Sequence, residues 1–221
     1  MTDTETTAEN RAEQSCECCG TAPTAESAAG ATTDRWLGGT DYLTATLPED
    51  LRRGLGRLLG VEPVDSIGEW IREVRGRVGD GSIGVGDLCH ADGETPHRGT
   101  VDGETYHFQC FYDAVVLAAL REGAVEIRTE SPDGSVVEAR TDGADLRVSP
   151  ASAVFSFGVE ATVEPPTGDG PTHADVYGAV CPYVKAFSDR AAYERWAESK
   201  DAATVAMPLA GATELASALV V

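Results

Sequence analysis

Residues 106–120 read YHFQCFYDAVVLAAL, an aromatic segment followed by a continuous apolar run. Alternation through residues 100–109, around a turn at Asp102-Gly103, predicts a β-hairpin. The apolar run at residues 114–120 predicts a buried helix that begins near Cys110. A hairpin followed directly by a buried helix is typical of a mixed helix and sheet fold.

The sequence after this helix contains mostly strand signals. Pro132-Asp133-Gly134 is a strong turn between two apolar segments and predicts a second hairpin. Runs of strands with helices between and after them predict an α+β fold with mostly antiparallel strands and packed helices. The remaining expectations are strands at 146–148, 154–157, 176–187 and 205–207, a loop at 164–172, and helices after Ser188 or Asp189 and at 212–221.

The segment before the hairpin predicts two short helices. Thr46-Leu47-Pro48-Glu49 reads as a capping box with Thr46 as N-cap, and Gly60 can end that helix. Ser66-Ile67-Gly68-Glu69 opens the second helix in the same way. Residues 34–98 are therefore expected to form a small helical region, and residues 99–221 the core that follows it.

Residues 1–33 contain no Val, Ile, Leu or Phe. Such a segment buries too little apolar surface to offset the entropy of ordering, so we expect a disordered acidic tail. Cys16, Cys18 and Cys19 lie within it and suggest a soft-metal relay, although they can equally be incidental thiols of a solvated tail.

The charge balance is strongly acidic, with 37 acidic and 17 basic residues and a formal net charge of -20. Only Lys185 and Lys200 are lysines. An acidic surface nearly free of lysine is typical of halophilic proteins, where salt screens the repulsion. It argues against nucleic acid as a partner. The absence of a long apolar run or a signal-like N-terminus predicts a cytoplasmic protein without a membrane span.

Cys110 and Asp113 are the most informative pair of residues in the sequence. Residues three apart on a helix share one face, and a thiol near a helix N-terminus is expected to have a lowered pKa. A partly buried Asp113 could have a raised pKa and carry a proton. The pair can therefore hold a metal ion and deliver a proton beside it. The alternative is that Cys110 is a small buried hydrophobic residue and that Asp113 caps the helix.

Cys181 is a second candidate ligand, and Pro182 fixes the backbone beside it. Two thiolates with few nitrogen ligands nearby favour soft cations over structural zinc, which needs four closely spaced ligands. We expect all six cysteines to be thiols in a reducing compartment. Cys89-His90, His107 and His173 are interpreted as structural or ordinary residues.

The segment from Tyr106 to the C-terminus resembles the organomercurial lyases, the MerB family. The resemblance rests on an ordered set of landmarks: the aromatic segment with Cys110-Phe111-Tyr112-Asp113, the apolar helix and hairpin, Val148-Ser149-Pro150, and Cys181 followed by Tyr183, Phe187 and Trp196-Ala197. Family members often have two adjacent cysteines at the second site, whereas Val180 precedes Cys181 here. The family's N-terminal domain is winged-helix-like, and residues 34–98 would be a reduced version.

The resemblance implies a function for each of three residues. Cys110 and Cys181 would bind mercury as thiolates, and Asp113 would protonate the carbon, so that R–Hg⁺ becomes R–H and Hg(II). No organic cofactor is implied, and Hg(II) would pass to small thiols or to a mercuric reductase. The alternatives are a non-catalytic protein that binds or carries Cu, Zn or Hg on the same fold, and, less favoured by the charge, a DNA-binding regulator.

Overall fold

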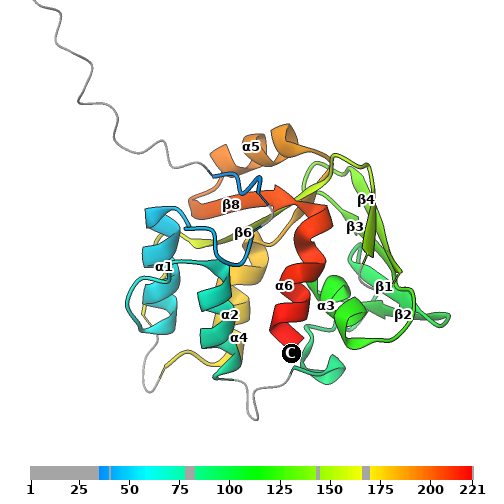
Figure 1. The fold of residues 1–221 in the computed structure, drawn as a ribbon, viewed down its shortest axis with the longest axis horizontal. Coiled ribbons are helices and arrows are strands. Elements are labelled where there is room, and N and C mark those ends of the chain that lie inside the picture. Colours follow the sequence, from blue (N-terminus) through cyan, green and yellow to red (C-terminus); the bar gives the residue numbers. More distant parts are fainter. Residues whose placement is uncertain (1–34, 40, 78–82, 143–144, 166–169, 221) are drawn as a thin grey trace, which may run out of the picture. The chain divides into compact units, whose positions relative to one another are not determined.

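The computed structural model describes residues 35–39, 41–77, 83–142, 145–165 and 170–220. This part of the chain contains two antiparallel sheets and six α-helices, which confirms the α+β prediction (Figure 1). The expected tail, with Cys16, Cys18 and Cys19, lies outside the described residues. The described residues all fall within one compact unit, and the expected boundary between residues 98 and 99 stays a prediction.

The larger sheet has five strands in the order β2-β1-β3-β4-β5, each antiparallel to its neighbours. Both expected hairpins are present. Asp102 and Gly103 have positive φ angles of 52° and 82°, and Gly134 has a φ of 85°, as tight hairpin turns require. The strands are β1 (Arg98–Val101), β2 (Glu104–His107), β3 (Glu126–Glu130), β4 (Val136–Asp142) and β5 (Asp145–Ser149).

The smaller sheet has β6 (Val154–Glu160) at its centre, between β7 (Ala186–Phe187) and β8 (Ala202–Pro208). Six consecutive residues of β6 are buried, because helices cover both faces of this sheet. In Figure 1, α5 (Arg190–Glu198) lies on the opposite side of β8 from the other helices. Asp189 caps α5, as expected, by accepting a hydrogen bond from the backbone N–H of Ala192 at 2.8 Å.

The first two helices, α1 (Glu49–Leu59) and α2 (Ile67–Arg75), pack their apolar faces into the main core. Ser66 is the N-cap of α2, as predicted. The prediction for α1 was wrong at its start, because Pro48 and not Thr46 is the N-cap. A proline holds the preceding residue in an extended conformation, so the helix begins only after Pro48.

The strand predicted at residues 176–187 was also wrong. Residues His173–Val180 form α4, Cys181–Tyr183 form a 3₁₀ turn, and only β7 is extended. Thr172 and Asp175 form a capping box at the start of α4. Val176, Val180 and Val184 are buried at a spacing of four residues, which is a helical period that the apolar run concealed.

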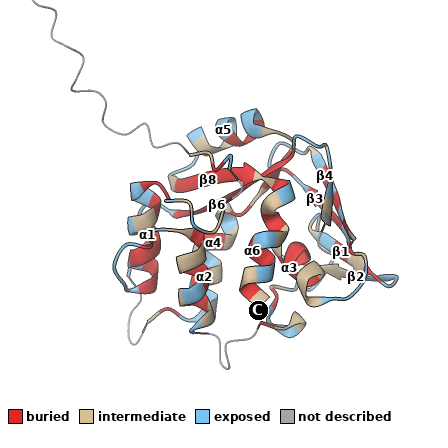
Figure 2. Cartoon of the chain, viewed as in Figure 1, coloured by how far each residue is buried: buried red, intermediate tan, exposed pale blue. Residues whose placement is uncertain are grey.

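The remaining helices are α3 (Tyr112–Leu120) and α6 (Ala212–Val220), which pack against each other in the main core. In Figure 2 buried residues are red, and they lie along β8 and on parts of α3 and α6. No helix in the described ranges is long and apolar enough to cross a membrane.

Candidate active site

Cys110 lies in the bend between β2 and α3, two residues before the helix begins. Asp113 is in the first turn of α3. The Sγ–H of Cys110 donates a hydrogen bond to Oδ2 of Asp113 at 3.2 Å. Both residues are only 4% exposed. The thiol and the carboxylate thus form a hydrogen-bonded pair in a buried site.

Neighbouring elements hold α3 in a fixed position. A Cβ on Gly99 of β1 would come within 3.0 Å of Cδ2 of Leu117, so the absence of a side chain lets α3 lie close against this strand. On the other side, the hydroxyl of Tyr112 donates to the backbone carbonyl of Ala212 at 3.1 Å. The Tyr112 ring also stacks on Phe155 of β6. These contacts fix the orientation of the first turn that carries Asp113.

Cys181 reaches the same site from the end of α4, where it is the C-cap residue. Its side chain makes hydrogen bonds with the thiols of Cys110 and Cys89, and these bonds together with burial strongly raise its pKa. The structure therefore brings Cys110, Asp113 and Cys181 together. Their chemical roles stay predictions.

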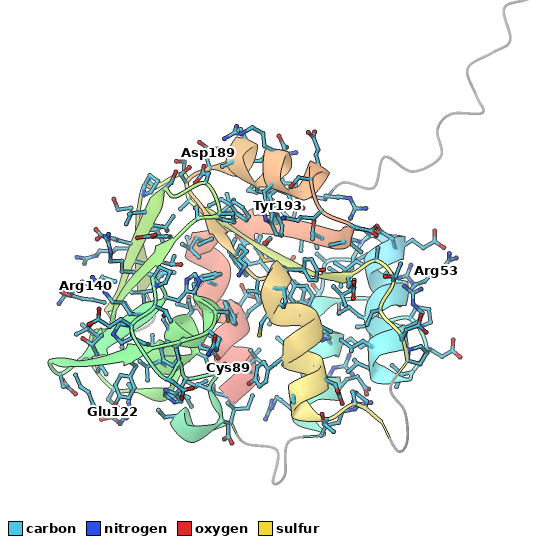
Figure 3. All side chains as sticks on the ribbon, turned by 180° about the vertical axis from the view of Figure 1, so that it is seen from behind. Arg53, Cys89, Glu122, Arg140, Asp189 and Tyr193 are labelled. Atoms are coloured by element: carbon cyan, nitrogen blue, oxygen red, sulfur yellow. The ribbon has the colours of Figure 1, made fainter. Side chains whose placement is uncertain are left out.

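Cys89 is a third thiol in this cluster, and the sequence interpretation did not place it there. The hydrogen bond from Cys181 lowers the pKa of Cys89, while burial and the charge of Asp113 oppose that change. The backbone carbonyl of Cys89 accepts a hydrogen bond from the N–H of Gln109 at 2.8 Å, one residue before Cys110. Figure 3 shows the side of the molecule on which Cys89 lies.

Tyr177 of α4 is the other site residue that sequence reasoning missed. Its pKa is strongly raised, first by burial and then by the nearby Asp113, Cys89, Cys181 and Cys110. Its hydroxyl donates to the carbonyl of Asp87 at 3.3 Å. Tyr177 thus connects α4 to the segment that carries Cys89. Only the helical period of residues 176–184 could have indicated this position.

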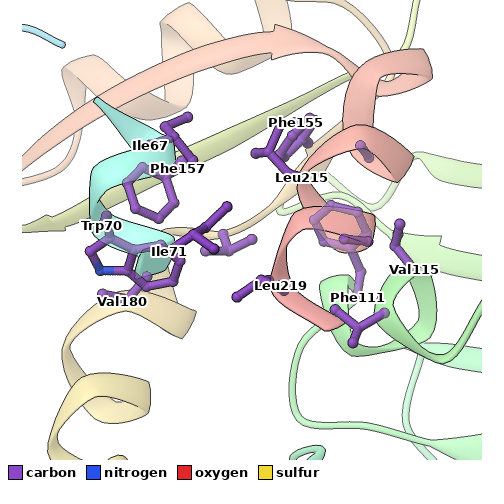
Figure 4. Close-up of a cluster of buried hydrophobic side chains, with 14 of the residues drawn as sticks. Ile67, Trp70, Ile71, Phe111, Val115, Phe155, Phe157, Val180, Leu215 and Leu219 are labelled. Atoms are coloured by element: carbon purple, nitrogen blue, oxygen red, sulfur yellow. The ribbon is translucent and has the colours of Figure 1, made fainter. Parts of the chain in front are cut away.

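A mainly apolar cavity of about 70 Å³ opens beside the three predicted residues. Trp70, Phe157, Val180 and Leu219 are among its walls, and Figure 4 shows these side chains converging from α2, β6, α4 and α6. The rings of Trp70 and Phe157 pack edge to face with centroids 5.0 Å apart. The cavity can hold a small apolar group next to the sulfur atoms.

The histidines with described side chains have structural contacts. Nε2 of His90 lies 2.8 Å from the carbonyl of Val85, and Nδ1 of His107 accepts from the N–H of Thr95 at 3.1 Å. Among the described residues, no three His, Cys, Asp or Glu side chains are already arranged to hold one metal ion.

The comparisons with known proteins identify the family. The model of the MerB family, alkylmercury lyase, matches residues 91–221, more than half of the chain. The chain therefore belongs to the alkylmercury lyase family. Cys110, Asp113 and Cys181 all lie within the matched range.

One similar solved structure is described as the mercury-bound form of MerB2. It is 19% identical, with a TM-score of 0.44, over 57% of this chain and 58% of that chain. This chain thus spans a little over half the length of that structure. A search of curated proteins finds no match.

Proposed function

We propose that this protein cleaves the carbon–mercury bond of organomercurials by protonolysis, converting R–Hg⁺ and a proton into R–H and Hg(II). The observation that carries the proposal is the buried hydrogen bond from Cys110 to Asp113 at 3.2 Å, in a cavity that Cys181 also lines. Membership of the alkylmercury lyase family supports the same chemistry.

In the first step, Cys110 exchanges its proton for mercury. As Sγ of Cys110 forms a bond to R–Hg⁺, its proton passes along the existing hydrogen bond to Oδ2 of Asp113. Asp113 becomes a neutral carboxylic acid beside the bound substrate. Burial favours this transfer because it removes a negative charge from a position only 4% exposed.

In the second step, Cys181 binds the same mercury, losing its own proton to solvent. Two thiolates increase the electron density on mercury, so that the carbon attached to it becomes more basic. Asp113 then donates its proton to that carbon as a general acid. The C–Hg bond breaks, R–H leaves, and Hg(II) remains bound by the two sulfur atoms.

The cavity would receive the organic group. Its walls are mostly aliphatic and aromatic, and its volume is about 70 Å³. An apolar cavity of about 150 Å³ is the size that accommodates benzene. Methylmercury and ethylmercury should therefore be better substrates than phenylmercury.

Hg(II) would then leave to small thiols or to a mercuric reductase, and no organic cofactor is needed. The cytoplasmic and halophilic assignments stay predictions that bear on assay conditions. The second candidate function is non-catalytic binding of soft metals, which the three neighbouring thiols favour because binding needs no proton from Asp113.

Incubation with methylmercury and excess thiol at high salt in D₂O separates the two functions. We expect methane that carries one deuterium atom, because the acid proton exchanges with solvent. Asp133→Asn, in the turn between β3 and β4, is a matched carboxylate control that should behave as the original chain does. Tight mercury binding without methane, in protein shown to be folded by circular dichroism, would support the binding function instead.

A further inference from the structure

We propose that Cys89 is a relay thiol that accepts Hg(II) from the Cys110–Cys181 pair and carries it toward solvent. This inference rests on the proposed function. Its basis is the arrangement of the three sulfur atoms, in which Cys181 contacts both Cys110 and Cys89.

Cys110 is more buried than the other two cysteines of the cluster. Cys110 is 4% exposed, whereas Cys181 and Cys89 are both partly exposed. A cleavage site benefits from excluding water, but a metal held there by two thiolates cannot easily be reached by a thiol from solution. Cys89 is more exposed than Cys110 and lies beside the pair, so it offers a first step outward.

The backbone keeps Cys89 at this place. Its carbonyl accepts from the N–H of Gln109 at 2.8 Å, and His90 forms an isolated β-bridge with Phe108. The N–H of Ala91 also donates to the carbonyl of His107 at 2.9 Å. The segment is therefore attached to the chain just before Cys110, so Cys89 does not depend on a loop movement to approach the site.

The transfer is a thiol exchange that balances without an oxidant or reductant. Sγ of Cys89 forms a bond to Hg(II), and the bond from Cys110 to Hg(II) breaks. The proton lost by Cys89 is gained by Cys110, which restores its hydrogen bond to Asp113. Mercury remains two-coordinate, now between Cys181 and Cys89, so the transfer is consistent with the lack of a preformed three-ligand group among the described residues.

The test uses Hg(II) itself, so that it does not depend on cleavage. In full-length protein with Cys16, Cys18 and Cys19 replaced by serine, one equivalent of Hg(II) is loaded and its loss to excess external thiol is timed. We expect both Cys89→Ser and Cys89→Ala to slow the loss about tenfold, because neither side chain can bind mercury. Serine keeps a hydrogen-bonding group and so controls for a structural role.

Two results would overturn the relay. Loss at the original rate in both variants would show that mercury leaves without Cys89. A normal rate in Cys89→Ser and a slow rate in Cys89→Ala would show that the hydrogen bond to Cys181 matters and the sulfur does not.

A second measurement needs no substitution at Cys89. Hg(II) loading should protect Cys89 from alkylation by iodoacetamide, and unchanged alkylation of Cys89 beside protected Cys110 and Cys181 would contradict the relay. If methylmercury released no methane, the proposed lyase function would be wrong. The protection of Cys89 by Hg(II) would be unaffected by that outcome.

Discussion

The site is assembled from two arms that differ in how they hold their sulfur atoms. In the first arm, Cys110 precedes the N-terminus of α3 and bonds to Asp113 within the same local motif. In the second arm, Cys181 lies at the C-terminus of α4 and finds its partners only through tertiary contacts. A helix N-terminus favours negative charge and a C-terminus disfavours it. The first arm is thus suited to start the reaction, and the second to complete mercury binding.

The largest expected effects come from the two ligands themselves. Cys110→Ser should abolish both methane release and the transfer of a proton to Asp113, since the oxygen is a poor ligand for mercury. Cys181→Ser should also abolish methane release but should still bind methylmercury through Cys110. Methane yield and methylmercury titration of the two variants check this difference. Equal loss of binding in both would contradict the assigned order of the arms.

Asp113→Asn should have the next largest effect. An amide cannot deliver the proton, and a general acid contributes about 10²–10⁴-fold to a rate. Single-turnover methane release should fall by that factor, while methylmercury stays bound to the two thiols. Retained activity in Asp113→Asn would show that the proton comes from another group.

A smaller effect is expected from the cap of the second arm. Thr172→Ala removes the side chain that accepts from the N–H of Asp175 at 3.2 Å, and loss of an N-cap costs about 1 kcal/mol. If this whole loss of stability is felt at the position of Cys181, the affinity of the site for Hg(II) falls about fivefold.

Asp189→Ala is the matched control for this variant, because it removes the cap of α5 on the other side of β8. Urea unfolding should show a similar loss of stability for the two variants, but only Thr172→Ala should weaken mercury binding. Equal weakening in both would mean that the cap of α4 has no specific effect on the site.

The smallest effect concerns the pH dependence of stability. Burial, and secondarily the charge of Lys185, lower the pKa of His97 to about 4. The carbonyl of His97 accepts from Phe108 on the first arm, and Lys185 follows Cys181 on the second. Between pH 6.5 and about 4, His97 is protonated in the unfolded chain but neutral in the folded protein. The free energy of unfolding is therefore highest above pH 6.5 and decreases as the pH falls toward about 4.

The comparison for this effect is His97→Gln, which cannot titrate. Unfolding free energies of both proteins, measured in urea from pH 7 to pH 4 at constant high salt, should differ in slope. The original chain should lose more stability as the pH falls. Parallel curves would show that the titration of His97 does not affect the stability of the folded protein.

The two arms also differ in how far the sequence could predict them. The hairpin and α3 follow from a local alternation, a turn with positive φ and an apolar run, so the position of Cys110 and Asp113 could be anticipated. The segment 176–187 was wrongly expected to be a strand, because its helical period was hidden in a mostly apolar run. The capping box at Thr172 and Asp175 was the signal that would have corrected it.

Cys89 could not have been predicted from local pattern. It lies 21 residues before Cys110, and tertiary contacts bring it beside Cys181: backbone contacts with residues 107–109 and the bond from Tyr177 to Asp87. Similarly, Thr46 was predicted as a cap from its spacing alone, but the effect of Pro48 on the chain before it moved the helix start.

The central claim is that Cys110 and Cys181 bind one mercury ion with Asp113 beside it. A crystal structure of the protein loaded with a single equivalent of Hg(II), in the Cys89→Ser variant so that no relay can occur, tests this most directly. We expect one mercury atom bonded to Sγ of both cysteines, with a carboxylate oxygen of Asp113 as the nearest acid group. Mercury bound by only one of the two sulfurs, or at a separate position, would contradict the account.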